Sequence, residues 1–295
     1  MRIGLIGDIH LYDLRVTPRQ MLSKRVLGQS NLWLNRRNRF RHALLPSYVR
    51  HLGELGLDLL LSSGDLTTSS LPAEFAKVRD ALAPIADAGT PLVLVPGNHD
   101  RYTFRSQRVR RMEAELGDWV PDPFPGSRRL TDHWRLIALD SGVPNVWASR
   151  GRIGPEQLDA LRAAATACEP GDGLLVLNHY PAIVPRGTAR AWSHDLAEHA
   201  EVHRILESAR GTVVYLHGHV HRPWHHPPQT QAADGRAFGF HSLNAGSPCM
   251  VSERYPHGQG VWHLDLDGPG AVAVHHVLTD PAANTFHATE HVLSG

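Results

Sequence analysis

Residues 215–222 read YLHGHVHR and end the apolar run TVVYL, which has the composition of a buried strand. Where that strand ends, the chain places His217, His219 and His221 around Gly218. Neutral imidazole is a common ligand for transition-metal ions, and glycine lets the backbone come close to an ion. The chain also holds 21 histidines in 295 residues, so a general richness in histidine is the alternative to a metal site.

Short apolar runs alternate with segments of helical periodicity along the rest of the chain. The runs are IGLIG, DLLLSSG, PLVLVPG, RLIALDSG, GLLVLNH and VVYLHG, at residues 3–7, 58–64, 91–97, 135–142, 173–179 and 213–218. Helical spacing marks residues 71–89 and 154–167, where Pro155 and Glu156 are typical of a first helical turn. The alternation predicts an α/β fold, in which helices connect the strands.

The pattern changes near the C-terminus, where little helical periodicity is present. Two alternating runs in residues 262–277, WHLDLDGPGAVAVHHV, flank a DGPG turn and predict a β-hairpin. We expect the strands of residues 223–295 to complete a second sheet within one domain, residues 1–295.

Composition limits the class of protein. The formal net charge of +1 gives no general affinity for nucleic acid. Only two cysteines occur, Cys168 and Cys249, which excludes a disulfide framework and a thiolate zinc site. The apolar run before Asp8 is short for a signal peptide, and no stretch reaches the roughly 20 apolar residues of a transmembrane helix. We therefore expect a cytoplasmic protein.

Aspartate, asparagine and histidine residues, whose side chains can bind metal ions, follow five of the apolar runs. These residues are Asp8 and His10; Asp65; Asn98, His99 and Asp100; Asn178 and His179; and His219 and His221. In α/β sheets, functional groups gather beyond the carboxyl ends of the strands, so we expect these side chains to share one rim. In extended backbone, residues two apart point the same way, which lets each D-x-H or H-x-H pair face one ion. Mixed nitrogen and oxygen ligands suit Mn, Fe, Zn, Co or Ni better than calcium.

In this order, the motifs DIH, GDLT, GNHD, NHY and GHVH resemble those of the calcineurin-like metallophosphoesterase family, over residues 3–222. The later LNAGSP, residues 243–248, resembles a further strand-end segment of that family. One departure concerns the fourth motif, which often reads HH, because Tyr180 follows His179 here. The resemblance implies a four-layer α/β/β/α sandwich, with two mixed β-sheets flanked by helices.

The resemblance also implies two divalent ions, with manganese favoured. One ion would be held by Asp8, His10, Asp65 and His221, and the other by Asp65, Asn98, His179 and His219. A hydroxide that bridges the ions would attack phosphorus, and His99 would act as general acid or stabilise the transition state. Asp100 would orient His99. The implied enzyme is a phosphohydrolase that cleaves a phosphodiester or pyrophosphate bond. Phosphomonoester cleavage and a non-catalytic scaffold of the same fold are the alternatives.

The segment between Asp13 and Glu54 contains no acidic residue. Its basic residues are Arg15, Arg19, Lys24, Arg25, Arg36, Arg37, Arg39, Arg41 and Arg50. We interpret residues 15–50 as a basic insertion or cap near the site, with Arg36 and Arg37 as candidate substrate contacts. A solvated helix face, an electrostatic funnel and a surface that rests on anionic lipid are three open explanations.

The portion SKRVLGQSNLWLNRR, residues 23–37, resembles an insertion in chlamydial-type UDP-2,3-diacylglucosamine pyrophosphatases. We therefore expect a phosphorylated anionic small molecule or a lipid-linked phosphate as substrate, with peripheral contact at the inner face of an anionic membrane. Nucleic acid is disfavoured because the chain is short for an added DNA-binding domain, and no obligate protein partner is inferred. Four further histidines are interpreted as structural or substrate contacts, and Asp140 as a turn residue. These histidines are His217, His225, His226 and His241.

Overall fold

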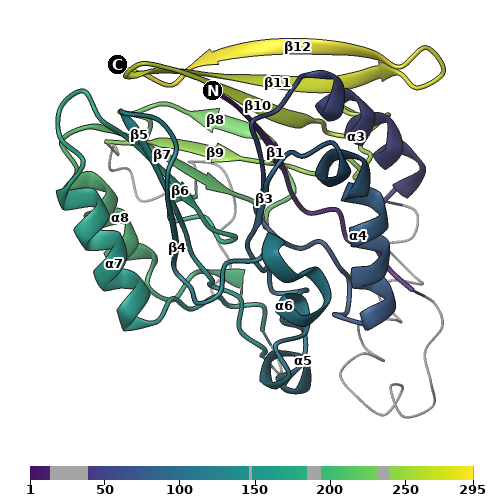
Figure 1. The fold of residues 1–295 in the computed structure, drawn as a ribbon, viewed down its shortest axis with the longest axis horizontal. Coiled ribbons are helices and arrows are strands. Elements are labelled where there is room, and N and C mark those ends of the chain that lie inside the picture. The colour runs from purple at the N-terminus through teal and green to yellow at the C-terminus, as the bar shows by residue number, and fades with distance from the viewer. Residues whose placement is uncertain (14–38, 146–147, 185–193, 232–238, 295) are drawn as a thin grey trace.

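The computed structural model describes residues 1–13, 39–145, 148–184, 194–231 and 239–294. Within them, two mixed β-sheets pack face to face and helices cover the two outer faces (Figure 1), which confirms the expected α/β/β/α sandwich. None of the described helices is both long enough and apolar enough to cross a bilayer.

The first sheet has the strand order β12-β11-β10-β1-β2-β3. Its strands are β1 (Arg2–Ile6), β2 (Leu59–Ser62), β3 (Leu92–Leu94), β10 (Val261–Asp267), β11 (Gly270–Asp280) and β12 (Thr285–Val292). Strands β1, β2 and β3 are parallel, whereas β10, β11 and β12 pair antiparallel. The segments on this side are η2 (His42–Leu44), α3 (Leu45–Glu54), α4 (Pro72–Asp87), α5 (Phe104–Arg108), α6 (Arg111–Leu116) and η3 (Gly117–Trp119).

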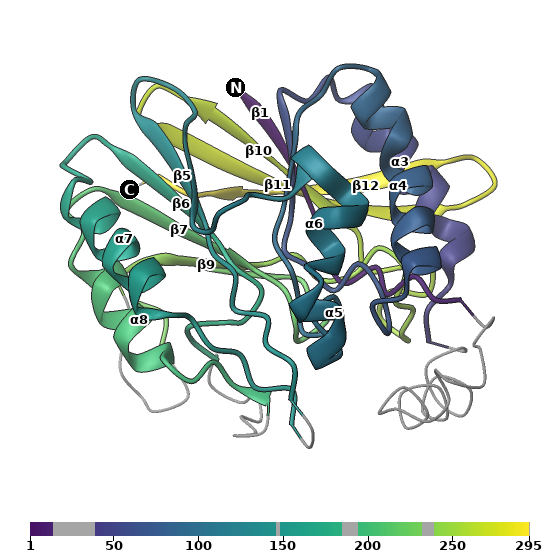
Figure 2. The ribbon, with the colours of Figure 1, turned by 60° about the horizontal axis from the view of Figure 1, so that its bottom comes forward.

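The second sheet has the strand order β4-β5-β6-β7-β9-β8. Its strands are β4 (Gly126–Arg129), β5 (Trp134–Ala138), β6 (Gly173–Leu177), β7 (Thr212–His217), β8 (Trp224–His226) and β9 (His241–Asn244). The four central strands are parallel, and the edge strands β4 and β8 are antiparallel to their neighbours. Figure 2 shows α7 (Pro155–Thr166) and α8 (His199–Glu207) on the outer face of this sheet.

The apolar runs are continuous because their strands are buried on both faces. In β6, Leu175 and Leu177 join the core between the sheets, whereas Leu174 and Val176 join the core beneath α7 and α8. All six runs contain strands, and the two predicted helices form at Pro72–Asp87 and Pro155–Thr166.

The predicted C-terminal hairpin forms as β10 and β11, but its expected place in the second sheet is wrong. Strand β10 pairs antiparallel with β1, and Leu264 lies opposite Ile3 in the first sheet. Trp262 and Leu264 on one face of β10 join the core between the sheets. The position beside β1 therefore buries the apolar face of this strand. After residue 223, only β8 and β9 among the described strands join the second sheet.

The expectation that residues 15–50 form a cap is wrong for residues 45–50. These residues begin α3, whose buried side chains Leu45, Tyr48, Val49 and Leu52 pack in the core on the outer side of the first sheet. An amphipathic helix with that apolar face has to lie against the sheet. Residues 14–38, with Arg36 and Arg37, lie outside the described residues.

The hairpin also buries a neutral histidine. His275 in β11 stacks on Trp262, with ring centroids 4.4 Å apart, and its Nε2–H donates to the carbonyl oxygen of Gln259 at 2.7 Å. Burial lowers the pKa of His275 to about 4, against a value near 6.5 in the unfolded chain. Between these pH values the unfolded chain binds more protons at His275 than the folded chain does. The free energy of unfolding is therefore unaffected by His275 above about pH 6.5 and decreases as the pH falls from there toward 4.

We expect His275 to cost the metal-free protein about 1 kcal/mol of unfolding free energy when the pH falls from 7.5 to 5.5. His275→Phe keeps an aromatic ring beside Trp262 but cannot be protonated, so its acid-induced loss should be smaller by about that amount. Urea denaturation at the two pH values measures the difference. His287→Gln, at an exposed position of β12, is the control and should follow the wild type. Equal losses in the wild type and His275→Phe would contradict the assignment.

Candidate metal centre

The seven predicted ligand residues follow the carboxyl ends of β1, β2, β3, β6 and β7. The structure brings six of them together in two groups of side chains, with Asp65 in both groups, and the seventh, Asn98, lies beside the second group. Four of these potential ligands are buried, with at most 2% of each residue exposed: Asp8, His10, Asp65 and His179.

The first group consists of Asp8, His10, Asp65 and His221, each with one potential ligand atom within 4.8 Å of the others. The Nε2 atoms of His10 and His221 are 2.9 Å apart, and the Nε2 of His221 lies 3.2 Å from Oδ1 of Asp8. Convergence of two imidazole nitrogens and two buried carboxylates on one point suits a divalent cation, because each donor offers a lone pair to it.

The second group consists of Asp65, His179 and His219. The Nδ1 of His219 and the Nε2 of His179 are 3.2 Å apart, and the amide Oδ1 of Asn98 lies 3.3 Å from the same Nε2. This set also combines nitrogen and oxygen donors, so it fits the same class of ion as the first group.

Asp65 lies between the two groups. Its Oδ2 is 3.6 Å from Nε2 of His10 and 3.4 Å from Nε2 of His179, while its Oδ1 accepts a hydrogen bond from the backbone N–H of His99 at 2.8 Å. Burial acts to raise the pKa of Asp65, but the imidazoles of His179 and His99 hold it well below its usual range. The carboxylate is therefore ionised and has the position that a shared ligand requires.

Hydrogen bonds outside the two groups hold the imidazoles of the second group. The Nδ1–H of His179 donates to the carbonyl oxygen of Ser63 at 2.8 Å, which leaves Nε2 facing Asp65. The Nε2–H of His219 donates to the carbonyl oxygen of His194 at 2.9 Å, so Nδ1 is the atom that faces His179. Such bonds fix the tautomer and orientation that metal-binding histidines need.

The backbone at the strand ends differs from the extended form expected for the paired residues. Asp8, His10, Asp65, His219 and His221 all have positive φ, between 50° and 72°. For side-chain-bearing residues this left-handed region is sparsely populated, and it concentrates at functional sites. Asp8 and His10 still face the same group, whereas His219 and His221 face different groups.

Glycines allow the close approach of the carboxylates. A Cβ at Gly218 would lie 2.3 Å from Oδ2 of Asp8, and a Cβ at Gly97 would lie 2.1 Å from Oδ1 of Asp65. The LNAGSP segment holds the same loops, because Asn244 donates to the carbonyl oxygen of Gly218 at 2.6 Å and Ser247 donates to that of Asp8 at 2.8 Å. This segment therefore supports the site through the backbone.

We expect Gly218→Ala to weaken binding of the first divalent ion by about 10- to 100-fold, because the added methyl group displaces the Asp8 carboxylate. Calorimetric titration of the metal-free protein with Mn²⁺ measures the affinity. Gly53→Ala in α3 is the control, since a Cβ there meets no atom within 4 Å. Equal Mn²⁺ affinity in the two variants would show that Asp8 does not depend on this contact.

His99 lies at the edge of the first group, with its ring centroid 4.7 Å from that of His10. Its Nδ1–H donates to the carbonyl oxygen of Thr68 at 2.6 Å, and its ring stacks with Tyr102 at 5.6 Å. The bond at Nδ1 thus fixes the orientation of the His99 ring beside the first group.

The expectation that Asp100 orients the His99 ring is wrong. The buried Asp100 carboxylate instead accepts hydrogen bonds from the backbone N–H groups of Leu66, Thr67 and Gly97, and from the Thr67 hydroxyl. Burial and the neighbouring Asp65 raise the pKa of Asp100 to about 6. Asp100 therefore ties the β2 and β3 loops together, and the carbonyl of Thr68 orients His99.

Arg101 is a buried residue that sequence reasoning missed. Its guanidinium pairs with Glu113 at 2.6 Å and with Asp140 at 2.9 Å, directly behind the loop of residues 97–100. Asp140 also accepts from the N–H of Gly142 at 2.8 Å, in agreement with its interpretation as a turn residue. The sequence around Arg101 does not indicate that it forms ion pairs, because its partners Glu113 and Asp140 come from other segments of the chain.

The other histidines near the site have structural contacts. His217 is fully buried and hydrogen-bonds through Nε2 with the Ser242 hydroxyl at 3.0 Å, and burial lowers its pKa to about 3. His225 and His241 contact each other at 2.9 Å between ring nitrogens. Tyr180, which replaces the second histidine of the fourth motif, is buried and donates its hydroxyl to the carbonyl oxygen of Ser149 at 2.6 Å.

Several curated relatives are similar in sequence. A 3′,5′-cyclic AMP phosphodiesterase of Vibrio vulnificus is 29% identical over 168 residues, covering 56% of this chain and 55% of that protein. A dual-specificity cAMP/cGMP phosphodiesterase of Mycobacterium tuberculosis is 32% identical over 187 residues, covering 60% of this chain and 53% of that protein. The chain thus spans about half the length of these two relatives. A probable cyclic nucleotide phosphodiesterase of Synechococcus is 28% identical over 225 residues, covering 76% and 78%.

Solved structures share the fold. A dimetal phosphatase from Danio rerio superposes with a TM-score of 0.66 at 15% identity and 99% coverage of both chains. A purple acid phosphatase from yellow lupin seeds gives 0.58 at 10% identity, covering 98% of this chain and 53% of the other. The sequence pattern of the calcineurin-like phosphoesterases matches residues 1–223. That match spans the strand ends and the two groups of side chains described above, and the chain belongs to the calcineurin-like phosphoesterase family.

Proposed function

We propose that the chain is a dinuclear metal-dependent phosphohydrolase that cleaves small phosphodiesters, with cyclic nucleotides as the first substrate class to test. The position of Asp65 carries this proposal, since its Oδ2 lies 3.6 Å and 3.4 Å from imidazole nitrogens of the two groups. The names of the three relatives support the diester preference, because two are named as cyclic nucleotide phosphodiesterases and the third as a probable one.

In the proposed centre, Asp8, His10, Asp65 and His221 hold one ion, and Asp65, Asn98, His179 and His219 hold the other. Two bound divalent ions supply Lewis-acid polarisation of the phosphoryl group and a hydroxide nucleophile near neutral pH. Manganese is the ion that we propose first for this nitrogen and oxygen donor set.

The chain's own contribution to the reaction centres on His99. Because Nδ1–H is held by the carbonyl oxygen of Thr68, the ring is fixed and Nε2–H is the proton that we propose to reach the leaving oxygen. The bond from the His99 backbone N–H to Asp65 links the loop that carries the acid to the shared ligand, which keeps the distance between them constant.

Hydrolysis assays with the manganese-loaded protein test the reaction class. We expect turnover of bis-p-nitrophenyl phosphate and 3′,5′-cyclic AMP, slower turnover of p-nitrophenyl phosphate, and little cleavage of ADP-ribose as a pyrophosphate probe. Faster turnover of the monoester or of the pyrophosphate would replace the diester assignment. Two bound ions per chain without turnover of any of the four compounds would favour the non-catalytic scaffold.

A further inference from the structure

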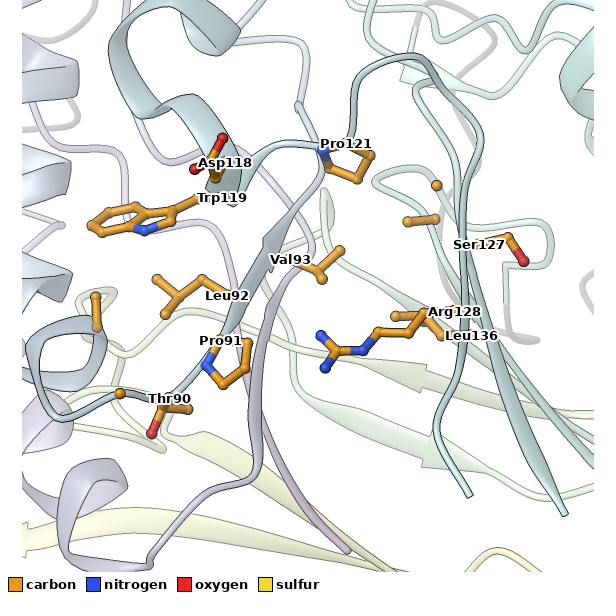
Figure 3. A pocket seen from close by; sticks show the side chains of 14 residues that line it. Thr90, Pro91, Leu92, Val93, Asp118, Trp119, Pro121, Ser127, Arg128 and Leu136 are labelled. Atoms are coloured by element: carbon orange, nitrogen blue, oxygen red, sulfur yellow. The ribbon is translucent and has the colours of Figure 1, made fainter. Parts of the chain in front are cut away.

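A cavity lies around the edge strand β3 of the first sheet, next to β4 and β5 of the second. It has a volume of about 630 Å³, and Figure 3 shows its lining side chains. Val93 of β3 lies with Leu136 and Ala138 of β5 on the side between the sheets, whereas Leu92 lies on the opposite face of β3, in the core under the helices beside Trp119. Both edge strands here are short, with three residues in β3 and four in β4.

This cavity is separate from the candidate metal centre. Its lining includes Thr90 and Pro91, which precede β3, whereas Asn98 and His99 follow the other end of that strand. A molecule bound here would therefore lie at the amino end of β3 and would not replace a substrate at the proposed metal site.

The lining is mostly aliphatic. Besides the four side chains of β3 and β5, Pro91 and Pro121 contribute apolar surface, and Trp119 is the aromatic residue of the lining. The guanidinium of Arg79 lies over the Trp119 ring at 5.1 Å from its centroid, so one face of that ring is already covered. A flat base would find little stacking surface, whereas a flexible alkyl chain can follow the aliphatic walls.

Arg128 is an exposed residue of the lining and adds a positive charge to it. In β4 it lies opposite Leu136 of the lining, while the next residue, Arg129, lies opposite Arg135 and binds Asp132 at 2.9 Å. Figure 3 shows the Arg128 guanidinium extending from β4 toward Pro91 and Val93. Within the described part of the chain, the Arg128 side chain has no hydrogen bond or ion pair. Asp118, the acidic residue of the lining, lies beside Trp119 and away from Arg128 in the same view.

We propose that this cavity binds a medium-chain fatty carboxylate, with the alkyl chain on the aliphatic walls and the carboxylate on Arg128. Small-molecule sites are typically apolar cavities of roughly 300–1,000 Å³ with a few polar groups that orient the ligand. A guanidinium binds a carboxylate through two parallel hydrogen bonds. One cation in an aliphatic cavity thus matches an aliphatic monoanion better than a nucleotide, whose phosphates require several donors.

Calorimetric titration of the full chain with octanoate and with octan-1-ol tests the site. We expect octanoate to bind the wild type, and Arg128→Ala to weaken octanoate binding about 10-fold while octanol binding changes less than about twofold. Val93→Phe, which fills the cavity, should weaken both ligands. Arg129→Ala is the matched control on the same strand and should leave both affinities unchanged.

Two results would overturn the proposal. The first is no octanoate binding up to about 5 mM in a wild-type protein that is folded by circular dichroism. The second is equal octanoate affinity in the wild type and Arg128→Ala, which would place the ligand elsewhere. Because neither readout uses phosphoester hydrolysis, the result is independent of the proposed catalytic function.

Discussion

Asp65→Asn is expected to lower cyclic nucleotide hydrolysis on the order of 10³-fold and to reduce bound metal below two ions per chain. The physical reason is the loss of an anionic oxygen, Oδ2, that lies 3.6 Å from Nε2 of His10 in the first group and 3.4 Å from Nε2 of His179 in the second. An amide at this place carries no charge, and its NH₂ group would repel a cation. Metal analysis after gel filtration, together with kcat/KM at saturating Mn²⁺, measures the two effects.

Asp58→Asn is the control for the removal of a carboxylate. Asp58 stands just before β2, on the same segment as Asp65, and accepts a hydrogen bond from the backbone N–H of Arg2 at 2.7 Å. We expect this variant to keep two ions and wild-type turnover. An Asp65→Asn protein that also retained two ions and full turnover would refute a shared-ligand role for Asp65.

His99→Gln is expected to lower kcat by about 10²- to 10⁴-fold while both ions remain bound, because His99 belongs to neither group of potential ligands. The loss should depend on the leaving group. Cyclic AMP releases a ribose alkoxide that needs a proton, whereas bis-p-nitrophenyl phosphate releases a stable phenolate. A general acid therefore predicts a larger kcat ratio, wild type over variant, for cyclic AMP.

Paired assays of the two substrates, with metal content measured on the same samples, make this test. His133→Gln, an exposed position just before β5, should leave both rates unchanged. Equal losses on both substrates would assign His99 to stabilisation of charge on phosphorus instead of proton donation. Loss of metal in His99→Gln would mean that His99 supports the ions themselves.

Much of the fold follows from local pattern. Strand β6 is predictable because Leu174 to Leu177 are apolar on both faces, and α7 because Pro155 and Glu156 open an amphipathic segment. In contrast, β4 reads GSRR and β12 reads TFHATEHV, with most residues exposed. Their conformation comes from pairing with β5 and β11, which no local periodicity records.

The candidate site also combines features that the sequence predicts with features that depend on tertiary contacts. Its seven potential ligands and His99 are recognisable by residue type and position, since each follows an apolar run. The backbone conformation at those positions could not be predicted from the sequence, because the left-handed φ of Asp8 and His10 depends on the loops around them. The role of Asp100 was misassigned for the same reason, as its partners Leu66 and Thr67 lie 34 and 33 residues away.

By itself, therefore, the sequence determined the α/β class, the buried strands, and the residues that gather at one rim, because periodicity and strand-end chemistry act over a few residues. Only the tertiary structure decided that the C-terminal hairpin pairs with β1, that Asp65 stands between two groups of imidazoles, and that Arg128 joins the lining of the cavity at β3. Each of these features depends on contacts between segments that lie far apart in the chain. The free energy of such contacts cannot be inferred from any one segment alone.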